Sequence, residues 1–487
     1  MSRLNSALLA TLDTPAKPTY DRTKLLPGIV HLGIGAFHRA HQAWYTEAVL
    51  NSAGGNWGII GCSLRSDSVS NQLDPQDGLY TILERSAQDK TQIIGAVVQV
   101  LVGPQKPQAI IDAIATESIK IISLTVTEKG YCHFPATGEL NFEHPDIAYD
   151  LGNITQPKSA IGYIVAGLIA RKDKGLPGLT VLSCDNLPNN GKVVGKCVIG
   201  FAEKISAELA SWIKSNVTFP CSMIDRIVPA TTPTDISNFE NTFGYEDAGM
   251  VVAEPFSQWV IEDNFIQGRP AWETVGATLV EHVEIYELIK LRLLNGTHSL
   301  LAYSGYLAGK ATIAEVMRDA TLTKACKAYM ALAAGTLAAP ADFDLAGYQA
   351  QLVERFANPG LQHRTWQIAM DGSQKIPQRW LGTLADAVSK GADIKLFAFA
   401  LAAWMKYISA VDEQGKAIEV SDPLAKTFAE AAAKHAGSDA DYVNAIFAIE
   451  GIFNPALLQI PKLKELTTQY LSAIKLQGAL KTLDNMM

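Results

Sequence analysis

Cysteine is scarce in this sequence of 487 residues, and its distribution excludes two kinds of stabilising site. The six cysteines contain no C-x-x-C pair, and none has a histidine at the spacing of a zinc ligand set; they stand at positions 62, 132, 184, 197, 221 and 326. This pattern indicates neither a disulfide framework nor a structural zinc site. It is typical of reduced thiols in a cytoplasmic protein.

Runs of positive charge are also missing. The formal net charge is −8, and no segment is rich in lysine and arginine or alternates basic with aromatic residues. These absences argue against a nucleic-acid-binding surface. We therefore expect small-molecule partners.

No segment is long and apolar enough to predict a membrane span. The most apolar window, residues 396–405, is far shorter than the roughly 20 residues that a spanning helix needs. The N-terminus lacks the continuous apolar region of a signal peptide. We expect no membrane role and a cytoplasmic location.

The length and the pattern of the chain predict two large domains, because 487 residues are too many for a single core. Short β-branched runs alternate with helical patterns in the first part, as in a parallel α/β sheet. Beyond about Glu281, alanine and leucine recur at helical spacing. We predict an α/β domain over residues 1–280 and a mainly α-helical domain over residues 281–487, connected between Gly268 and His282. The predicted strands are 28–32, 57–63, 94–102, 119–126, 179–183 and 250–253, and the predicted helices are 283–303, 344–356, 393–408, 424–435 and 442–450.

A glycine-containing turn follows the first predicted strand. Gly33 and Gly35 permit a tight turn and a close backbone approach, and the next helix can point its first amides at a pyrophosphate. His38 stands where the dinucleotide-binding fingerprint has its third glycine. An ordinary strand-to-helix turn is the alternative, but the position after the first strand favours a Rossmann-like dinucleotide-binding domain.

The end of the second predicted strand is where the adenosine ribose is recognised in such a domain. Asp67 could accept a hydrogen bond from a ribose 2′-hydroxyl, which favours NAD, whereas Arg65 and Ser66 could bind a 2′-phosphate, which favours NADP. We expect NAD and leave NADP open. Glu128 follows another predicted strand at the edge where open α/β sheets bind ligands.

Three polar residues with useful chemistry lie within nine positions of one another. On a helix with about 100° per residue, Lys290, Asn295 and His298 fall at roughly 0°, 140° and 80°, so all three could face one cleft. A lysine in apolar surroundings can serve as a general acid/base, and an amide can polarise a carbonyl group. The wet face of an ordinary amphipathic helix is the alternative.

Together with the glycine turn, these residues make the chain resemble the polyol-specific long-chain dehydrogenase/reductase family, which includes mannitol 2-dehydrogenase. Further motifs that carry the resemblance are Ser123–Tyr131, Ser183–Asn186, Met223–Pro229 and Glu254–Asp263, with Ile224 as a small departure from the pattern. The resemblance implies a metal-independent secondary alcohol dehydrogenase. It assigns catalytic roles to Lys290, Asn186, Asn295, His298, Asp225 and Glu287, and cofactor binding to Gly33, Gly35, Ala36, Phe37, Arg65, Asp67, Thr127 and Glu128.

Within the family, the likeness is closest to members that interconvert D-fructuronate and D-mannonate. It is strongest over residues 363–379, where a substrate carboxylate would find cationic partners. The candidate substrate-binding residues are His363, Arg364, Lys375 and Arg379, each with a solvated surface as the alternative. The resemblance thus implies reversible, NAD-dependent reduction of D-fructuronate to D-mannonate by a protein that we expect to be a monomer.

Two other functions remain open. One is the same chemistry on another substrate, as in a mannitol or D-arabinitol 2-dehydrogenase or a tagaturonate reductase. The other is a non-catalytic nucleotide-sensing protein, which predicts erosion of Lys290, Asn186, Asn295 or His298; all four are present.

Overall fold

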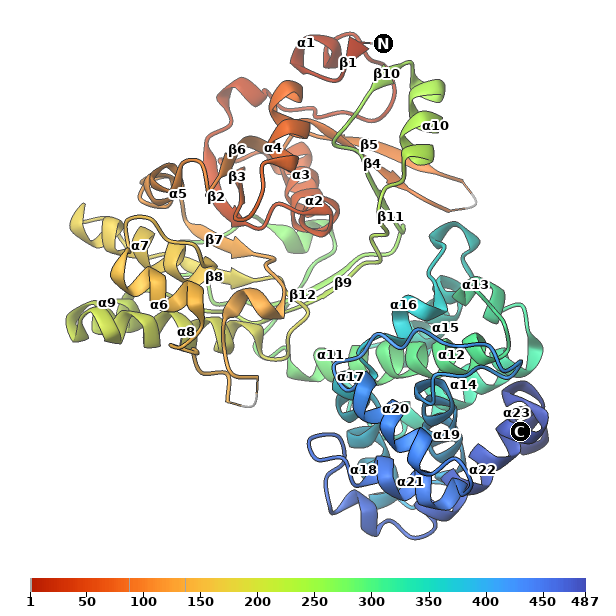
Figure 1. The fold of residues 1–487 in the computed structure, drawn as a ribbon. Coiled ribbons are helices and arrows are strands. Elements are labelled where there is room, and N and C mark those ends of the chain that lie inside the picture. The colour runs from red at the N-terminus through yellow and green to blue at the C-terminus, as the bar shows by residue number, and fades with distance from the viewer. Residues whose placement is uncertain (1, 87, 136) are drawn as a thin grey trace. The chain divides into compact units, whose positions relative to one another are not determined.

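The computed structural model of the chain describes residues 2–86, 88–135 and 137–487 (Figure 1). The chain divides into two compact units, Met1–Glu284 and Ile285–Met487. The division falls four residues beyond residue 280, the predicted end of the first domain.

A five-stranded sheet forms the centre of the first unit. Its order is β6-β3-β2-β7-β8, and every neighbouring pair is parallel. The strands are β2 (Pro27–Leu32), β3 (Gly58–Ser63), β6 (Val97–Val102), β7 (Ile121–Leu124) and β8 (Thr180–Ser183). The strand order therefore reverses between β2 and β7, and open α/β sheets bind dinucleotides at such a point.

Both faces of this sheet are buried, which explains its near-continuous apolar strands. Val30 and Ile122 point into one core together with residues of α5 (Pro107–Ile114), α7 (Ala160–Asp173) and α8 (Asn190–Ile205). Ile29 and Ile121 point into the opposite core, where α3 (Gln42–Ala53) contributes Tyr45, Val49 and Leu50. The remaining helices of the unit are α1 (Ser6–Leu9), α2 (Ala36–Ala40), α4 (Ser68–Leu73), α6 (Pro145–Gly152), α9 (Ala207–Asn216) and α10 (Pro233–Phe243).

Three smaller sheets complete the first unit. Their orders are β1-β10, β11-β4-β5 and β13-β12-β9. The strands are β1 (Ser2–Arg3), β4 (Tyr80–Glu84), β5 (Lys90–Ile94), β9 (Ser222–Asp225), β10 (Tyr245–Glu246), β11 (Val251–Ala253), β12 (Gln258–Glu262) and β13 (Thr278–Val280).

The prediction of a single strand over 94–102 was wrong. The chain leaves one sheet after Ile94, where β5 pairs with β4, and enters the central sheet at Val97. Gly95 lies at the break, where its amide donates to Glu47 Oε2 over 2.8 Å and its carbonyl oxygen accepts from Arg22 Nε over 2.9 Å. These bonds replace the ladder bonds of a continuous strand.

The second unit is built around two buried helices, α12 (Gly296–Leu307) and α19 (Lys395–Ile408). Every residue from Leu396 to Ile408 is buried, as expected for a helix that is apolar on all sides. Helices α14 and α22 pack against this pair. The other helices are α11 (Glu284–Ile289), α13 (Ile313–Val316), α14 (Ala320–Ala334), α15 (Leu345–Ala357), α16 (Thr365–Ala369), α17 (Gly372–Ile376), α18 (Gly382–Ser389), α20 (Ala425–Lys434), α21 (Asp439–Phe447), α22 (Leu463–Gln477) and α23 (Ala479–Met486).

Two π-helical segments interrupt the helices of this unit. Lys290–Asn295 connects α11 to α12, and Pro377–Leu381 connects α17 to α18. The uniform helix predicted over 283–303 is therefore wrong in its middle. Within the residues described, no helix is long and apolar enough to cross a membrane.

Candidate active site

The turn between β2 and α2 is tight because Gly33 adopts a positive φ of 97°. The Gly33 amide donates to Cys62 O over 2.8 Å, and a Cβ at this position would lie 2.2 Å from Thr125 O. Gly35 is exposed, and a Cβ there would meet only Gly33 O, at 3.8 Å. The first amides of α2, at Ala36 and Phe37, have no acceptor within the helix. This turn fits a dinucleotide pyrophosphate, which needs open backbone amides and no side chain above them.

His38 fills the position of the missing third glycine. Its ring stacks on His31 with the centroids 3.4 Å apart, and both residues are fully buried. His31 Nδ1 lies 2.8 Å from Ser123 Oγ, which donates to Gln42 Oε1 over 2.7 Å. Neither ring nitrogen of His38 has a hydrogen-bond partner in the described part of the chain. Burial lowers the pKa of His38 well below its usual value, so this stack is neutral.

The two candidates for recognising the adenosine ribose differ in their partners. Arg65 Nη2 forms an ion pair with Asp146 Oδ2 over 2.8 Å. Asp67 is exposed at the start of α4, where its Oδ2 accepts a hydrogen bond from Gln105 Nε2 over 3.3 Å. An exposed carboxylate and an arginine that already has an anionic partner fit a ribose hydroxyl better than a 2′-phosphate.

Asp185 shapes the loop that follows β7, although the sequence analysis did not select it. Its carboxylate accepts from the amides of Val126 over 3.0 Å and Thr127 over 2.8 Å, and from the Tyr131 hydroxyl over 2.8 Å. Burial raises the pKa of Asp185, and these three donors oppose that rise. Because its bonds replace ladder bonds, β7 ends at Leu124 instead of reaching residue 126 as predicted. Thr127, with φ of 66°, and Glu128 are exposed in this loop.

The loop after β8 carries Asn186, which is exposed. Asn190 fixes this loop, since its Nδ2 donates to Asp185 O over 2.9 Å and to Ser222 O over 2.8 Å. Asp225 is buried at the end of β9. The neighbouring Arg226 forms its ion pair with Glu84, at 2.5 Å.

In the second unit, Lys290 and Asn295 are the first and last residues of one π-helical segment. Lys290 is buried, with 8% of its surface exposed, whereas Asn295 is partly exposed. Such segments free main-chain carbonyl oxygens from the helix. Here Asn295 O accepts from Arg379 Nη1 over 3.4 Å and Gly296 O accepts from Trp380 Nε1 over 2.9 Å. Both donors belong to the other π-helical segment, so the two segments support each other. Glu287 lies one turn before Lys290 in α11.

His298, in α12, lies among aromatic and cationic groups of the same unit. Its ring stacks on Phe356 with the centroids 5.1 Å apart and meets His363 edge-on at 4.6 Å. Within the residues that the structure describes, His298 Nε2 is buried and has no hydrogen-bond partner. Burial is the main cause that lowers the pKa of His298 well below its usual value, and the nearby groups His363, Arg379, Arg355 and Lys375 lower it further. The result is a neutral imidazole in positive surroundings.

The four predicted substrate-binding residues are not equivalent. His363 is partly buried, and its pKa is lowered to about 4 by burial and by Arg355. Lys375 Nζ donates to Met370 O over 2.6 Å. Arg379 donates to the main-chain oxygen of Asn295 and to Ser299 Oγ, whereas Arg364 is exposed at the start of α16. Arg355, in α15, is buried beside them and was missed, because a lone arginine on an amphipathic helix gives no sequence signal.

Comparisons with known proteins match both units of the chain. The model of the mannitol dehydrogenase Rossmann domain matches residues 27–274, and that of the mannitol dehydrogenase C-terminal domain matches residues 282–475. D-mannonate oxidoreductase of Escherichia coli (strain K12) is 47% identical over 451 residues, which are 91% of this chain and 92% of that protein. Two solved structures are similar over nearly their whole length. They are Pseudomonas fluorescens mannitol 2-dehydrogenase in a ternary complex with NAD and D-mannitol (TM-score 0.87, 37% identity, 99% of each chain) and a substrate-free D-sorbitol dehydrogenase (TM-score 0.91, 32% identity, 99% of this chain and 100% of that one).

Proposed function

This chain belongs to the mannitol dehydrogenase family, and from that premise we propose that it catalyses the reversible reduction of D-fructuronate to D-mannonate with NADH. As a member of that family, it is an NAD-dependent oxidoreductase that acts on the CH–OH groups of polyols or sugar acids. The names of its relatives describe oxidoreductases, so a non-catalytic nucleotide sensor has no support among them.

The positive charge around His298 is the observation that carries the sugar-acid assignment. After burial, which is the largest cause, Arg379, Arg355 and Lys375 contribute to the lowered pKa of His298, so these three cations lie near the same imidazole. A uronate presents a carboxylate to such groups and forms charge-assisted hydrogen bonds, whereas a neutral polyol cannot. His298 Nε2 is buried and has no hydrogen-bond partner among the described residues, so it could accept a hydrogen bond from a substrate hydroxyl group. The 47% identity with D-mannonate oxidoreductase of E. coli agrees with this assignment.

In the proposed reduction, each of the four candidate catalytic residues of the second unit has one task. Bound NADH supplies the hydride to the ketone carbon. Lys290 donates a proton to the ketone oxygen, and Asn295 donates an amide N–H to the same atom as negative charge develops on it. His298 accepts from a substrate hydroxyl group, and Glu287 exchanges a proton with Lys290. For Asn186 and Asp225, in the first unit, the catalytic roles implied by the family resemblance stay predictions.

A polyol 2-dehydrogenase is the second candidate. It is favoured by the 37% identity with the Pseudomonas fluorescens enzyme, whose structure contains NAD and D-mannitol. The chemistry at Lys290 is the same in both candidates, so only the substrate distinguishes them.

An arginine-to-methionine exchange at Arg355 tests the sugar-acid assignment, because it removes the charge and keeps much of the apolar side chain. We expect kcat/KM for D-fructuronate to fall at least tenfold and kcat/KM for D-fructose to change less than about threefold. Arg318→Met, an exposed arginine of the same unit, is the matched control and should change neither. An equal loss for both substrates in Arg355→Met would refute a role of this charge in carboxylate recognition.

A further inference from the structure

The last segment of the first unit runs beside a strand that precedes it by about 20 residues. β12 and β13 pair in parallel with Glu262 opposite Val280, and the Asp263 amide donates to Val280 O over 3.0 Å. His282 and Glu284 follow Val280 by two and four positions. This register brings both side chains to the end of β12 that carries Glu262.

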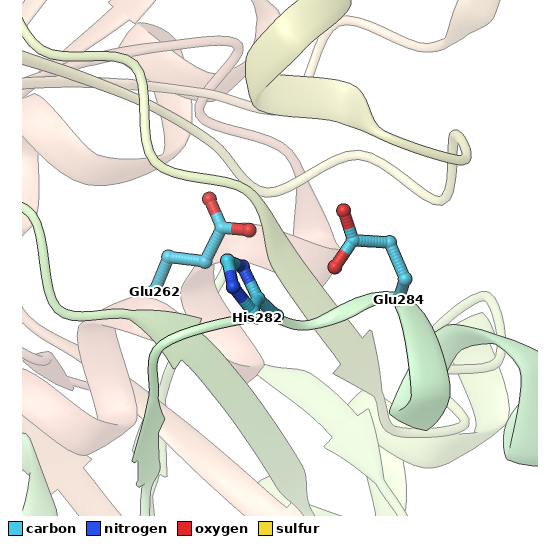
Figure 2. Close-up of side chains that lie close together, drawn as sticks. All are labelled: Glu262, His282 and Glu284. Atoms are coloured by element: carbon cyan, nitrogen blue, oxygen red, sulfur yellow. The ribbon is translucent and has the colours of Figure 1, made fainter.

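Glu262, His282 and Glu284 form one group of metal-ligand side chains. Each offers a ligand atom, and these atoms all lie within 4.8 Å of one another. Figure 2 shows the two carboxylates on either side of the imidazole ring. The group contains both ligand types, imidazole and carboxylate, that zinc accepts through nitrogen and oxygen.

The two carboxylates are already oriented by neighbouring donors. The Cys221 amide donates to Glu262 Oε2 over 2.8 Å. Lys192 Nζ binds Glu284 Oε1 at 2.5 Å. Hydrogen bonds of this kind hold ligand side chains in place around a metal ion and leave the second carboxylate oxygen able to bind it.

We propose that Glu262, His282 and Glu284 form a binding site for a divalent transition metal ion with the ligand preference of zinc. An imidazole with carboxylates suits Zn²⁺ and disfavours Mg²⁺ and Ca²⁺, which prefer oxygen ligands alone. Three protein ligands leave a fourth position for water. The site contains none of the residues assigned to hydride transfer, so its role is structural. A bound ion would connect the segment 281–284 to Glu262 at the end of β12.

The present separations are within reach of metal coordination. Tetrahedral zinc with bonds of about 2.1 Å places its ligand atoms about 3.4 Å apart, so the three atoms need to close by about 1.4 Å at most. His282 is exposed over 76% of its side chain and Glu284 over 43%, and both can move without disturbing the core. Binding therefore needs only rotamer changes at the surface.

Lys192 acts as a competing cation in this proposal. Its ammonium group pairs with Glu284 Oε1 at 2.5 Å, so it occupies one of the carboxylates that the metal ion would bind. A dication that binds the same carboxylate must weaken that ion pair. Replacing Lys192 with methionine should therefore tighten metal binding without altering any ligand.

Isothermal titration of the full chain with ZnCl₂ tests the proposal directly. We expect one equivalent of Zn²⁺ to bind to the wild type, at least tenfold weaker binding to His282→Ala and to Glu284→Gln, and severalfold tighter binding to Lys192→Met. MgCl₂ should give no binding isotherm. His435→Ala, a histidine of the second unit, is the control for loss of one imidazole and should bind as the wild type does. Equal Zn²⁺ affinity of the wild type and His282→Ala, or no binding to the wild type, would overturn the proposal.

A stability measurement gives an independent readout. Zn²⁺ at a hundred times its Kd should stabilise the wild type by about 2.7 kcal/mol and raise its Tm, because the unfolded chain does not hold the three ligands together. EDTA should reverse the rise. A rise of the same size in His282→Ala would place the bound ion elsewhere and contradict the assignment.

Discussion

Arg379 donates a hydrogen bond from Nη1 to the main-chain carbonyl oxygen of Asn295, over 3.4 Å, and a second one to Ser299 Oγ, over 2.9 Å. Asn295 is the last residue of the π-helical segment that begins at Lys290. Arg379 thus supports the residues assigned to proton donation and oxygen polarisation, in addition to contributing positive charge near His298.

Arg379→Met should therefore impair catalysis through the position of Lys290 and Asn295. We expect kcat to fall at least tenfold with every substrate, and the free energy of unfolding to fall by about 1–3 kcal/mol, because Asn295 O and Ser299 Oγ lose their donor. Steady-state kinetics and urea unfolding measure the two effects. Arg379→Lys, which keeps one donor, should recover part of kcat. A loss confined to KM for uronates would show instead that Arg379 serves only the substrate carboxylate.

Asp185→Asn tests the loop that follows β7. An asparagine keeps the size of the side chain but has only one acceptor oxygen, so one of the amides of Val126 and Thr127 would face an NH₂ group. We expect about 1–3 kcal/mol of destabilisation and a weaker affinity for NADH, measured by urea unfolding and by fluorescence titration. Glu128→Gln alters an exposed residue of the same loop and should leave stability unchanged. Unchanged stability in Asp185→Asn would contradict the organising role of this carboxylate.

The two glycines of the turn should respond differently to alanine. Gly33→Ala places a Cβ 2.2 Å from Thr125 O on a residue with a positive φ, so it should destabilise the protein as well as weaken NADH binding. Gly35→Ala meets no close atom and should retain stability. Its methyl group would stand where the pyrophosphate approaches, so NADH affinity should still fall at least tenfold. Normal NADH affinity in Gly35→Ala would remove this turn from the cofactor site.

Buried neutral histidines should make the protein sensitive to mild acid. Burial lowers the pKa of His31 to about 3 and that of His363 to about 4, against an ordinary value near 6.5 in the unfolded chain. Below about pH 6.5 the unfolded chain gains protons that the folded chain does not, so stability is complete above that pH and falls as the pH decreases toward about 4.

Urea unfolding at about pH 7 and about pH 5 measures this loss, which should be up to about 2 kcal/mol for each such histidine. His363→Phe keeps an aromatic ring beside His298 and cannot be protonated. Its stability should fall less between the two pH values than that of the wild type. The same acid sensitivity in both proteins would show that His363 is not a cause of it.

Much of the fold could be predicted from the sequence, because its determinants are local. The β-branched runs of β2, β3 and β8 mark strands that are buried on both sides, and Gly33 marks a turn that needs a positive φ. The family, the Rossmann-like and helical fold class, the oxidoreductase activity and the NAD cofactor are confirmed by the comparisons. The individual roles of the site residues stay predictions.

The features that could not be predicted depend on partners distant in the sequence. The π-helical segment at Lys290 is supported by Arg379 and Trp380, more than 80 positions away, so no pattern within residues 283–303 reveals it. Asp185 acts on amides about 60 positions before it. Its presence in the motif Ser183–Asn186 was the available signal, since an acidic residue directly after a buried strand needs donors.

The most direct test of the proposed function is the oxidation of NADH by the purified protein with D-fructuronate, D-tagaturonate and D-fructose at equal concentrations, beside a Lys290→Ala variant. We predict the highest kcat/KM for D-fructuronate, at least tenfold above that for either other substrate, and loss of activity with all three in Lys290→Ala. Preference for D-fructose would contradict the sugar-acid assignment in favour of a polyol dehydrogenase, and full activity of Lys290→Ala would contradict the proposed proton donor.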